Sequence, residues 1–112
     1  MKKTLLSSML AIGLLLSVSA SAFAETTTYN SNGQTFSKSW ELPASGSGWL
    51  MKYGFNTAWI NEDYTHTYHT TYHHTATVSN NNGAFSDEDS GGAWAGIEVT
   101  HRGSYIEYSI TW

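Results

Sequence analysis

Four of the chain's five histidines lie within nine residues, at His66, His69, His73 and His74, and imidazole is a common ligand for zinc. On a helix, the four-residue spacing of His69 and His73 would place both rings over one ion. On a strand the same spacing corresponds to about 13 Å, whereas Zn–N bonds are about 2.0–2.1 Å long. We therefore interpret the histidines as surface or hydrogen-bonded groups and predict no metal or cofactor. A site built across strands with His101 stays the alternative.

The sequence offers few motifs for catalysis. It has no cysteine, no Gly-x-Ser-x-Gly elbow, no phosphate-binding loop and no His-Glu-x-x-His motif. Asp87, Glu88 and Asp89 lack the EF-hand pattern, so residues 87–92 are predicted to form a solvated acidic loop rather than a calcium site. We predict a protein without enzymatic activity. A small secreted hydrolase is kept as a third hypothesis because convergent sites escape motif analysis.

The first 24 residues have the pattern of a secretory signal peptide. A positive start at Lys2 and Lys3 precedes a largely apolar run over residues 5–18, and the small residues at Ala22 and Ala24 mark a cleavage site. We predict cleavage between Ala24 and Glu25 and a secreted, extracellular protein. Removal of residues 1–24 from 112 leaves 88, enough for one small domain with a single core.

The charge of the remaining chain excludes two classes of function. Loss of Lys2 and Lys3 lowers the net charge from −4 to −6, with Lys38, Lys52 and Arg102 as the basic residues. This charge argues against nucleic acid as a partner and against peptides that attack anionic membranes by positive charge. Protonation of all five histidines would bring the charge to −1, so a histidine charge switch is an alternative to ordinary solvated histidines.

Aromatic side chains must hold this cysteine-free domain together. All five Trp, all seven Tyr and three of the four Phe follow residue 24, and each can bury roughly 150–250 Å². The composition is rich in Thr, Ser, Asn and Gly and poor in helix-forming residues, which indicates an all-β chain. We assign most aromatic residues to the core and two or three to a binding face that meets sugar or lipid.

The pattern along the chain predicts a small antiparallel β-sandwich of five or six strands in two short sheets. Residues 25–32 are predicted to be a loose N-terminus, residues 34–42 an extra strand, and residues 43–48 a flexible joint. We accordingly divide the chain into a leader (1–24), a polar segment (25–47) and a main module (48–112).

Alternation predicts the strands of the main module. Trp49, Met51, Tyr53 and Phe55 give one apolar face. Residues 64–78 form the longest strand-like region, with a bend near residues 70–71, and its odd-numbered Thr and His residues are predicted to be its wetter face. Residues 80–83 are predicted to be a turn. Residues 93–100 and 104–112 complete the module as two strands joined through residues 101–103, and the face with Ile106, Tyr108, Ile110 and Trp112 is predicted to point inward.

Aromatic and small residues follow a characteristic order through the main module. Besides one contiguous block over residues 74–78 and the asparagine-rich turn after it, the pattern consists of residues spaced through the module: Gly48, Trp49, Tyr53, Gly54, Tyr64, Tyr68, Tyr72, Ala93, Trp94, Ala95, Val99, Tyr105, Tyr108 and Trp112. This pattern resembles that of lactococcin 972-type bacteriocins. It covers roughly residues 48–112.

This resemblance implies a secreted antibacterial protein with a small β-sandwich fold. It implies inhibition of wall and septum synthesis through the lipid-linked cell-wall precursor, and production beside dedicated immunity or export membrane proteins. The alternative is a secreted carbohydrate- or wall-binding module without killing activity. Exposed edge strands allow a homodimer. The predicted binding residues are Trp49, Tyr53, Tyr68, Tyr72, His74, Trp94 and Arg102.

Overall fold

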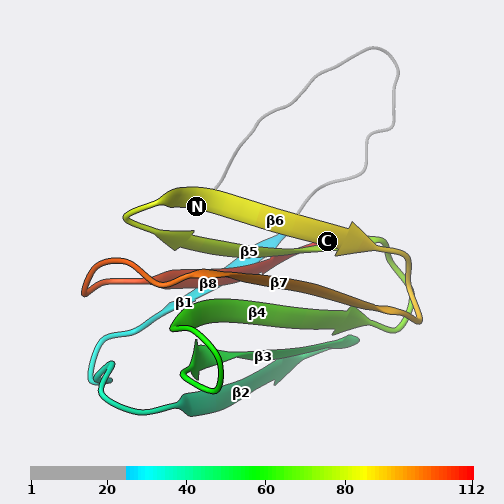
Figure 1. Ribbon diagram of the computed structural model, residues 1–112. Coiled ribbons are helices and arrows are strands. Elements are labelled where there is room, and N and C mark those ends of the chain that lie inside the picture. Colours follow the sequence, from blue (N-terminus) through cyan, green and yellow to red (C-terminus); the bar gives the residue numbers. More distant parts are fainter. Residues whose placement is uncertain (1–24) are drawn as a thin grey trace.

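The computed structural model describes residues 25–112, which form eight strands (Figure 1). The predicted leader, with Ala24, lies outside the described residues. Within 25–112 the chain forms no helix, and so none with the length and apolarity needed to cross a membrane. The strands are β1 (Thr26–Asn30), β2 (Trp40–Gly46), β3 (Trp49–Asn56), β4 (Glu62–His69), β5 (His74–Asn80), β6 (Gly83–Asp89), β7 (Trp94–Thr100) and β8 (Glu107–Thr111).

The strands build two antiparallel sheets of four. The first sheet has the order β1-β8-β5-β6, and the second has the order β2-β3-β4-β7. The predicted fold class, an all-β sandwich of two antiparallel sheets, is confirmed, with eight strands in place of the five or six expected.

Aromatic rings fill the space between the sheets. Tyr53 of β3 stacks on Tyr29 of β1 with ring centroids 5.3 Å apart and contacts Tyr108 of β8 at 5.0 Å. Trp40 of β2 meets Tyr108 edge-on at 5.9 Å. Each fully buried side chain of this size contributes roughly 1.5–3 kcal/mol of hydrophobic free energy. These contacts join one sheet to the other without a disulfide.

The N-terminal residues belong to the first sheet, so the loose N-terminus predicted for residues 25–32 is wrong. β1 pairs along its whole length with β8, and the Glu25 amide donates to the Trp112 carbonyl at 2.6 Å. The ring of Tyr29 faces inward and packs in the aromatic core. This contact explains why the polar N-terminal segment forms a strand.

The strand predicted at residues 34–42 and the flexible joint at 43–48 are also wrong in position. β2 runs from Trp40 to Gly46 and pairs with β3 throughout. Its Pro43 is compatible with a strand because β2 is the edge of its sheet and needs no N–H on its free side. Only Ser47 and Gly48 form the turn, with Gly48 at a φ of 82°. Residues 25–47 therefore contribute one edge strand to each sheet.

The long strand-like region is two strands that belong to different sheets. β4 ends at His69, β5 begins at His74, and the predicted bend at residues 70–71 lies in the connection between the sheets. The buried residues are odd-numbered in β4 but even-numbered in β5, because an odd number of positions, five, separates His69 from His74. The prediction of a wetter odd-numbered face holds in β5 and is wrong in β4, where Thr65, Thr67 and His69 are buried.

Internal hydrogen bonds explain why β4 can bury polar side chains. Thr65 Oγ1 donates to the Thr77 carbonyl at 3.0 Å, and Thr67 Oγ1 lies 2.7 Å from His74 Nδ1. A buried hydroxyl with a hydrogen-bond partner avoids most of the cost of leaving water. These bonds also link β4 to β5 across the sandwich.

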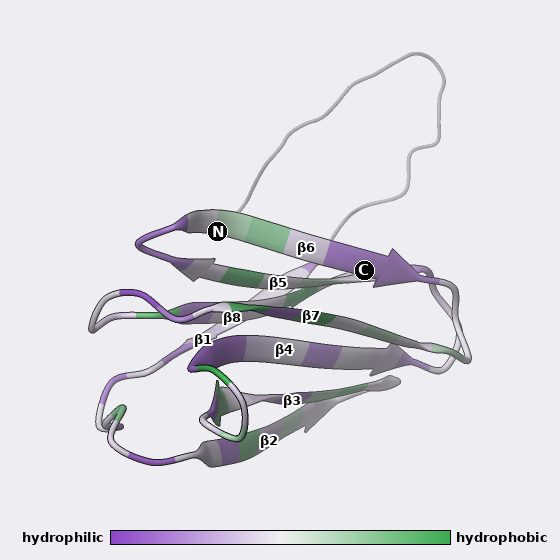
Figure 2. Ribbon diagram, viewed as in Figure 1, coloured by the Kyte–Doolittle hydropathy of each residue, from purple (hydrophilic) through white to green (hydrophobic). Residues whose placement is uncertain are grey.

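The predicted turn at residues 80–83 is confirmed, but the acidic loop at 87–92 is mostly wrong. Asn81 and Asn82 connect β5 to β6, and Gly83 has a φ of 127°. β6 continues through Asp89, so its last three residues are the hydrophilic strand end in Figure 2. Asp87 Oδ2 accepts a hydrogen bond from the Gly96 amide of β7 at 3.1 Å, which links the two sheets at this side.

The last two strands agree with the alternation of the sequence. β7 and β8 lie within the predicted ranges, although they join different sheets. Ile106, Tyr108 and Ile110 are fully buried and Trp112 is partly buried, as predicted for the inward face.

The buried hydroxyl of Tyr108 predicts a loss of stability in alkali. Burial, and secondarily the charge of Asp63, raise the pKa of Tyr108 well above its ordinary value of 10.0. The unfolded chain releases this proton first, so the stabilisation is present below about pH 10 and decreases as the pH rises above it. We expect the free energy of unfolding of Tyr108→Phe to fall less steeply above pH 10 in urea titrations. Tyr72→Phe, on an exposed ring, is the control; equal slopes for wild type and Tyr108→Phe would contradict the assignment.

Candidate functional site

The outer face of the second sheet carries aromatic, apolar and charged side chains that are exposed or partly exposed. Alternation points one residue in two away from the core, and the strand register places these residues in three rows across the sheet. We call this surface the outer face. Its rows are Ser45, Leu50, Tyr68 and Trp94; Pro43, Lys52, His66 and Gly96; and Glu41, Gly54, Tyr64 and Glu98.

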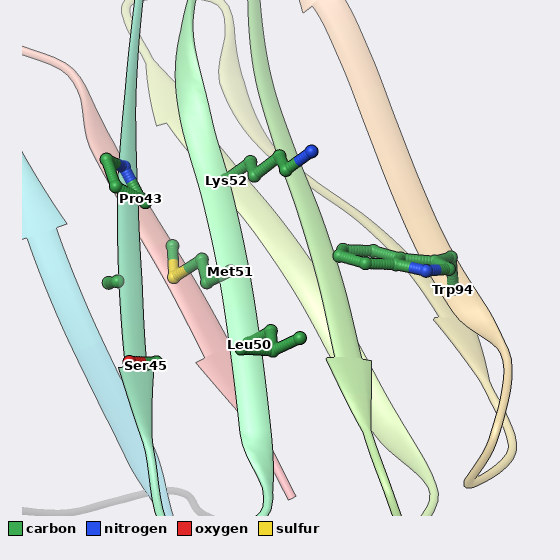
Figure 3. Close-up of a pocket in the computed structure, with 7 residues that line it drawn as sticks. Pro43, Ser45, Leu50, Met51, Lys52 and Trp94 are labelled. Carbon is green, nitrogen blue, oxygen red and sulfur yellow. The ribbon is translucent and has the colours of Figure 1, made fainter.

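The first row is apolar and aromatic. Trp94 and Leu50 are each 48% exposed, although both are large apolar residues. Tyr68 lies between them in the register and its ring centroid is 5.4 Å from that of Trp94, with an interplanar angle of 42°. A shallow groove of about 400 Å³ extends from Trp94 to Pro43 and Ser45 of β2. Figure 3 shows Leu50 and Lys52 extending from β3 toward the indole.

Lys52 brings a positive charge to the aromatic row. Its Nζ lies 5.9 Å from the centroid of the Trp94 ring, within the range of a cation–π interaction. The ammonium keeps its three donors at the edge of the groove. An apolar ring with a donor beside it can bind a ligand that has both a hydrophobic face and polar edges.

The second and third rows add hydrogen-bonding groups of fixed orientation. Tyr64 donates to Glu41 Oε2 at 2.8 Å, and His66 Nε2 lies 3.1 Å from Glu98 Oε2. Burial and the bond to Glu41 raise the pKa of Tyr64 above its ordinary value of 10.0, so the phenol stays a hydrogen-bond donor further into alkaline solution. Gly96 leaves room for the His66 ring, because a Cβ there would lie 3.0 Å from its Cδ2.

This arrangement is suited to saccharides. The C–H face of a pyranose ring is apolar and can lie on an exposed indole or phenol, while its hydroxyls need donors and acceptors at the ring edge. Trp94 and Tyr68 offer the ring surfaces. Lys52, Glu41 and Glu98 offer charged hydrogen-bond partners, which form stronger hydrogen bonds than neutral ones.

The structure separates the seven predicted binding residues into three groups. Tyr68 and Trp94 lie together on the outer face. Tyr72 is 59% exposed but lies in the β4–β5 connection, and Arg102 lies in the β7–β8 connection at the other end of the strands.

Trp49, Tyr53 and His74 are 7%, 6% and 0% exposed, so the structure buries these three predicted binding residues, and Trp49 and Tyr53 pack in the hydrophobic core. The aromatic pattern alone did not mark Leu50 and His66 as members of the outer face. Leu50 follows the buried Trp49 in β3, so alternation points its side chain to the opposite side of the sheet. This alternation was the available indication that Leu50 belongs to the outer face.

The histidines of the cluster have separate roles within the described chain. His69 Nδ1 accepts hydrogen bonds from the amides of residues 71 and 72, and His74 Nε2 donates to the Ala93 carbonyl at 2.8 Å. His66 and His73 are paired with glutamates on the surface. Residues 25–112 contain no group of three or more His, Cys, Asp or Glu residues placed to hold a metal ion. The two buried histidines bind the connection after β4 and the connection before β7.

A buried polar cluster lies at the start of β4. Asp63 is fully buried, with His101 Nδ1 2.8 Å from its Oδ1 and Asn80 Nδ2 donating to its Oδ2 at 2.9 Å. The His101 ring packs against Phe36 at 4.3 Å and Phe55 at 4.9 Å. These contacts connect β4, β5 and the β7–β8 connection, so we assign the cluster to stability.

Comparison with known proteins adds no further constraint. No protein-family model, curated protein or solved structure matches the chain. The resemblance to lactococcin 972-type bacteriocins therefore stays a prediction from the sequence.

Removal of the Asp63 carboxylate tests the role of this cluster. Asp63→Ala leaves His101 and Asn80 without their buried partner, and we expect the free energy of unfolding to fall by about 3–5 kcal/mol. Glu62→Ala, one position away and partly exposed, should cost less than about 1 kcal/mol. Urea unfolding at pH 7 measures both. Equal effects of the two substitutions would show that the cluster does not stabilise the fold.

Proposed function

We propose that this chain is a secreted, non-enzymatic antibacterial protein that inhibits wall synthesis by binding the saccharide part of the lipid-linked cell-wall precursor. The observation that supports this most is the exposed Trp94 ring, which lies against the partly buried Tyr68 ring and has Lys52 beside it, on a face that is not part of the core. The secretion signal and the resemblance of residues 48–112 supply the antibacterial part of the proposal. Dedicated immunity or export membrane proteins of the producer are proposed partners on the same resemblance.

Charge favours the sugar over the pyrophosphate as the group recognised. The outer face has one cation, Lys52, whereas Glu41 and Glu98 place two carboxylates in its third row. Two carboxylates would repel a pyrophosphate but accept hydrogen bonds from sugar hydroxyls and N-acetyl amides. Recognition of the saccharide therefore needs no net positive charge on the protein.

The shape of the groove favours a second candidate, a wall-glycan-binding module without killing activity. The depression between Pro43 and Trp94 is shallow and open along the sheet. An open platform accommodates an internal stretch of a polymer as well as the end of a precursor. The two candidates share one binding face and differ in their effect on growing cells.

Substitution of Trp94 tests both candidates. We expect Trp94→Ala to weaken binding of muropeptides and of the purified lipid-linked precursor by about tenfold or more, because an aromatic anchor carries much of the energy of such a site. Lys52→Ala should weaken binding by a smaller factor. Tyr72→Ala removes an exposed aromatic ring away from the outer face and should bind like wild type. Calorimetric titration of residues 25–112 and its variants measures these affinities.

Growth experiments separate the two candidates. Residues 25–112 are added to related bacteria, and growth, septum morphology and dye leakage are followed. Growth arrest without leakage, lost in Trp94→Ala, supports inhibition of wall synthesis. Glycan binding without inhibition across a broad panel supports the second candidate, and absence of saccharide binding in wild type overturns both.

A further inference from the structure

The connection between β3 and β4 exposes two large apolar side chains at its tip. Trp59 is 91% exposed and Ile60 is 45% exposed. Within residues 25–112, no large hydrophobic residue is more exposed than Trp59. We call residues 57–61 the tip loop.

Hydrogen bonds hold both ends of the tip loop in place. At its start, the Thr57 amide donates to Ser39 Oγ at 2.9 Å and the Ala58 amide donates to Asn56 Oδ1 at 2.8 Å. At its end, the Asn61 carbonyl accepts from the His101 amide at 2.8 Å. The loop is thus tied to both neighbouring connections, and the backbone arrangement itself presents Trp59 to solvent.

Other connections bring suitable side chains to the same end of the molecule. The strand register places the connections 31–39, 57–61, 81–82 and 101–106 together at one end of the strands, seen on the left in Figure 1. This end contains Tyr105, which is 48% exposed, and two of the three basic residues of the described chain, Lys38 and Arg102, both exposed. Figure 2 shows the hydrophobic colour of the tip loop at this end.

Most of the acidic residues at this end are engaged or set back from the tip. Asp63 is buried against His101, and Glu107 accepts a hydrogen bond from the Tyr105 hydroxyl. Glu62 is partly buried at the start of β4. The exposed acidic run at the end of β6 lies at the opposite end of the strands. One end of the molecule therefore carries exposed aromatic, apolar and basic groups together with Glu62 and Glu107, and the other end carries the acidic run of β6.

A single exposed apolar residue on a soluble domain is ordinary. Here Trp59 and Ile60 occur with Tyr105 and two cations at one end, and this is the combination that a membrane–water interface accommodates. Trp and Tyr place an apolar ring among the acyl chains and a polar group among the headgroups, and Lys and Arg pair with lipid phosphates.

We propose that this end of the sandwich docks on a phospholipid bilayer. Trp59 and Ile60 enter the interfacial region of the bilayer, and Lys38 and Arg102 contact headgroup phosphates. The docking is peripheral, because only the short tip loop meets the acyl chains. It is driven mainly by burial of apolar surface and strengthened by anionic lipid.

This docking is independent of the saccharide proposal and compatible with it. Trp94 and Thr100 are the two ends of β7, and Thr100 pairs with Glu62 next to the tip loop. A strand of this length spans roughly 20 Å, so the sugar-binding part of the outer face would stand about that distance from the docked tip. A saccharide attached to a membrane lipid would project alongside the outer face.

Vesicle binding tests the proposal. Residues 25–112 are mixed with phosphatidylcholine vesicles containing increasing fractions of phosphatidylglycerol, and bound protein is measured by co-sedimentation. We expect Trp59→Ala to weaken partitioning by about tenfold or more and Lys38→Ala with Arg102→Ala to remove the dependence on anionic lipid. In wild type, tryptophan emission should shift to the blue and be quenched by brominated lipids. Trp59→Phe should lose most of that change while retaining more binding than Trp59→Ala.

Trp94→Ala is the matched control, since it removes a second exposed indole from a different surface. It should bind vesicles like wild type, whereas Trp59→Ala should bind muropeptides like wild type, so failure of either proposal is seen separately. Thermal melting checks that each variant is folded. Equal vesicle binding by wild type and Trp59→Ala, or none by wild type, would overturn the proposal. A Trp59-dependent dimer without vesicle binding would assign the tip loop to self-association instead.

Discussion

The contact of aromatic rings across the sandwich is the interaction on which the rest of this structure depends. Tyr53 packs against Tyr29 and Tyr108, which belong to the other sheet, and Trp40 closes the group from β2. Domains of this size commonly rely on disulfides or other cross-links, but this chain has no cysteine. Large aromatic rings compensate for the missing disulfides, because each ring buries a large apolar area for a single residue fixed in the fold. The edge strands β1 and β2 are ordered because they carry two of these rings inward.

A second constraint arises where the chain passes from one sheet to the other. The buried residues are odd-numbered in β4 and even-numbered in β5. Thr65 and Thr67 of β4 form hydrogen bonds with residues of β5, and His69 accepts hydrogen bonds from the amides of the connection that follows β4. His69 and His74 are thus buried where the chain passes from one sheet to the other, and their hydrogen bonds hold the neighbouring connections.

The demands of the core limit what the surface can do. Trp49 and Tyr53 are needed inside, which leaves Trp94 and Trp59 as the two strongly exposed indoles of the described chain. They lie on different surfaces, one on the outer face with Tyr68 and Lys52, the other on the tip loop. The first suits a sugar ring and the second a membrane interface, so the proposed activities do not compete for the same side chains.

The sequence alone was sufficient to predict the all-β class, the inward faces of β3 and β8 and the turn before Gly83, because these follow from local composition, alternation and turn chemistry. It also placed Tyr68 and Trp94 among the binding candidates. It did not predict that residues 25–47 form one edge strand in each sheet, or that the odd-numbered residues of β4 are buried. Each of these depends on which strand lies opposite, a long-range pairing that local periodicity does not contain. Only the tertiary structure decided which aromatic residues are core and which remain free to bind.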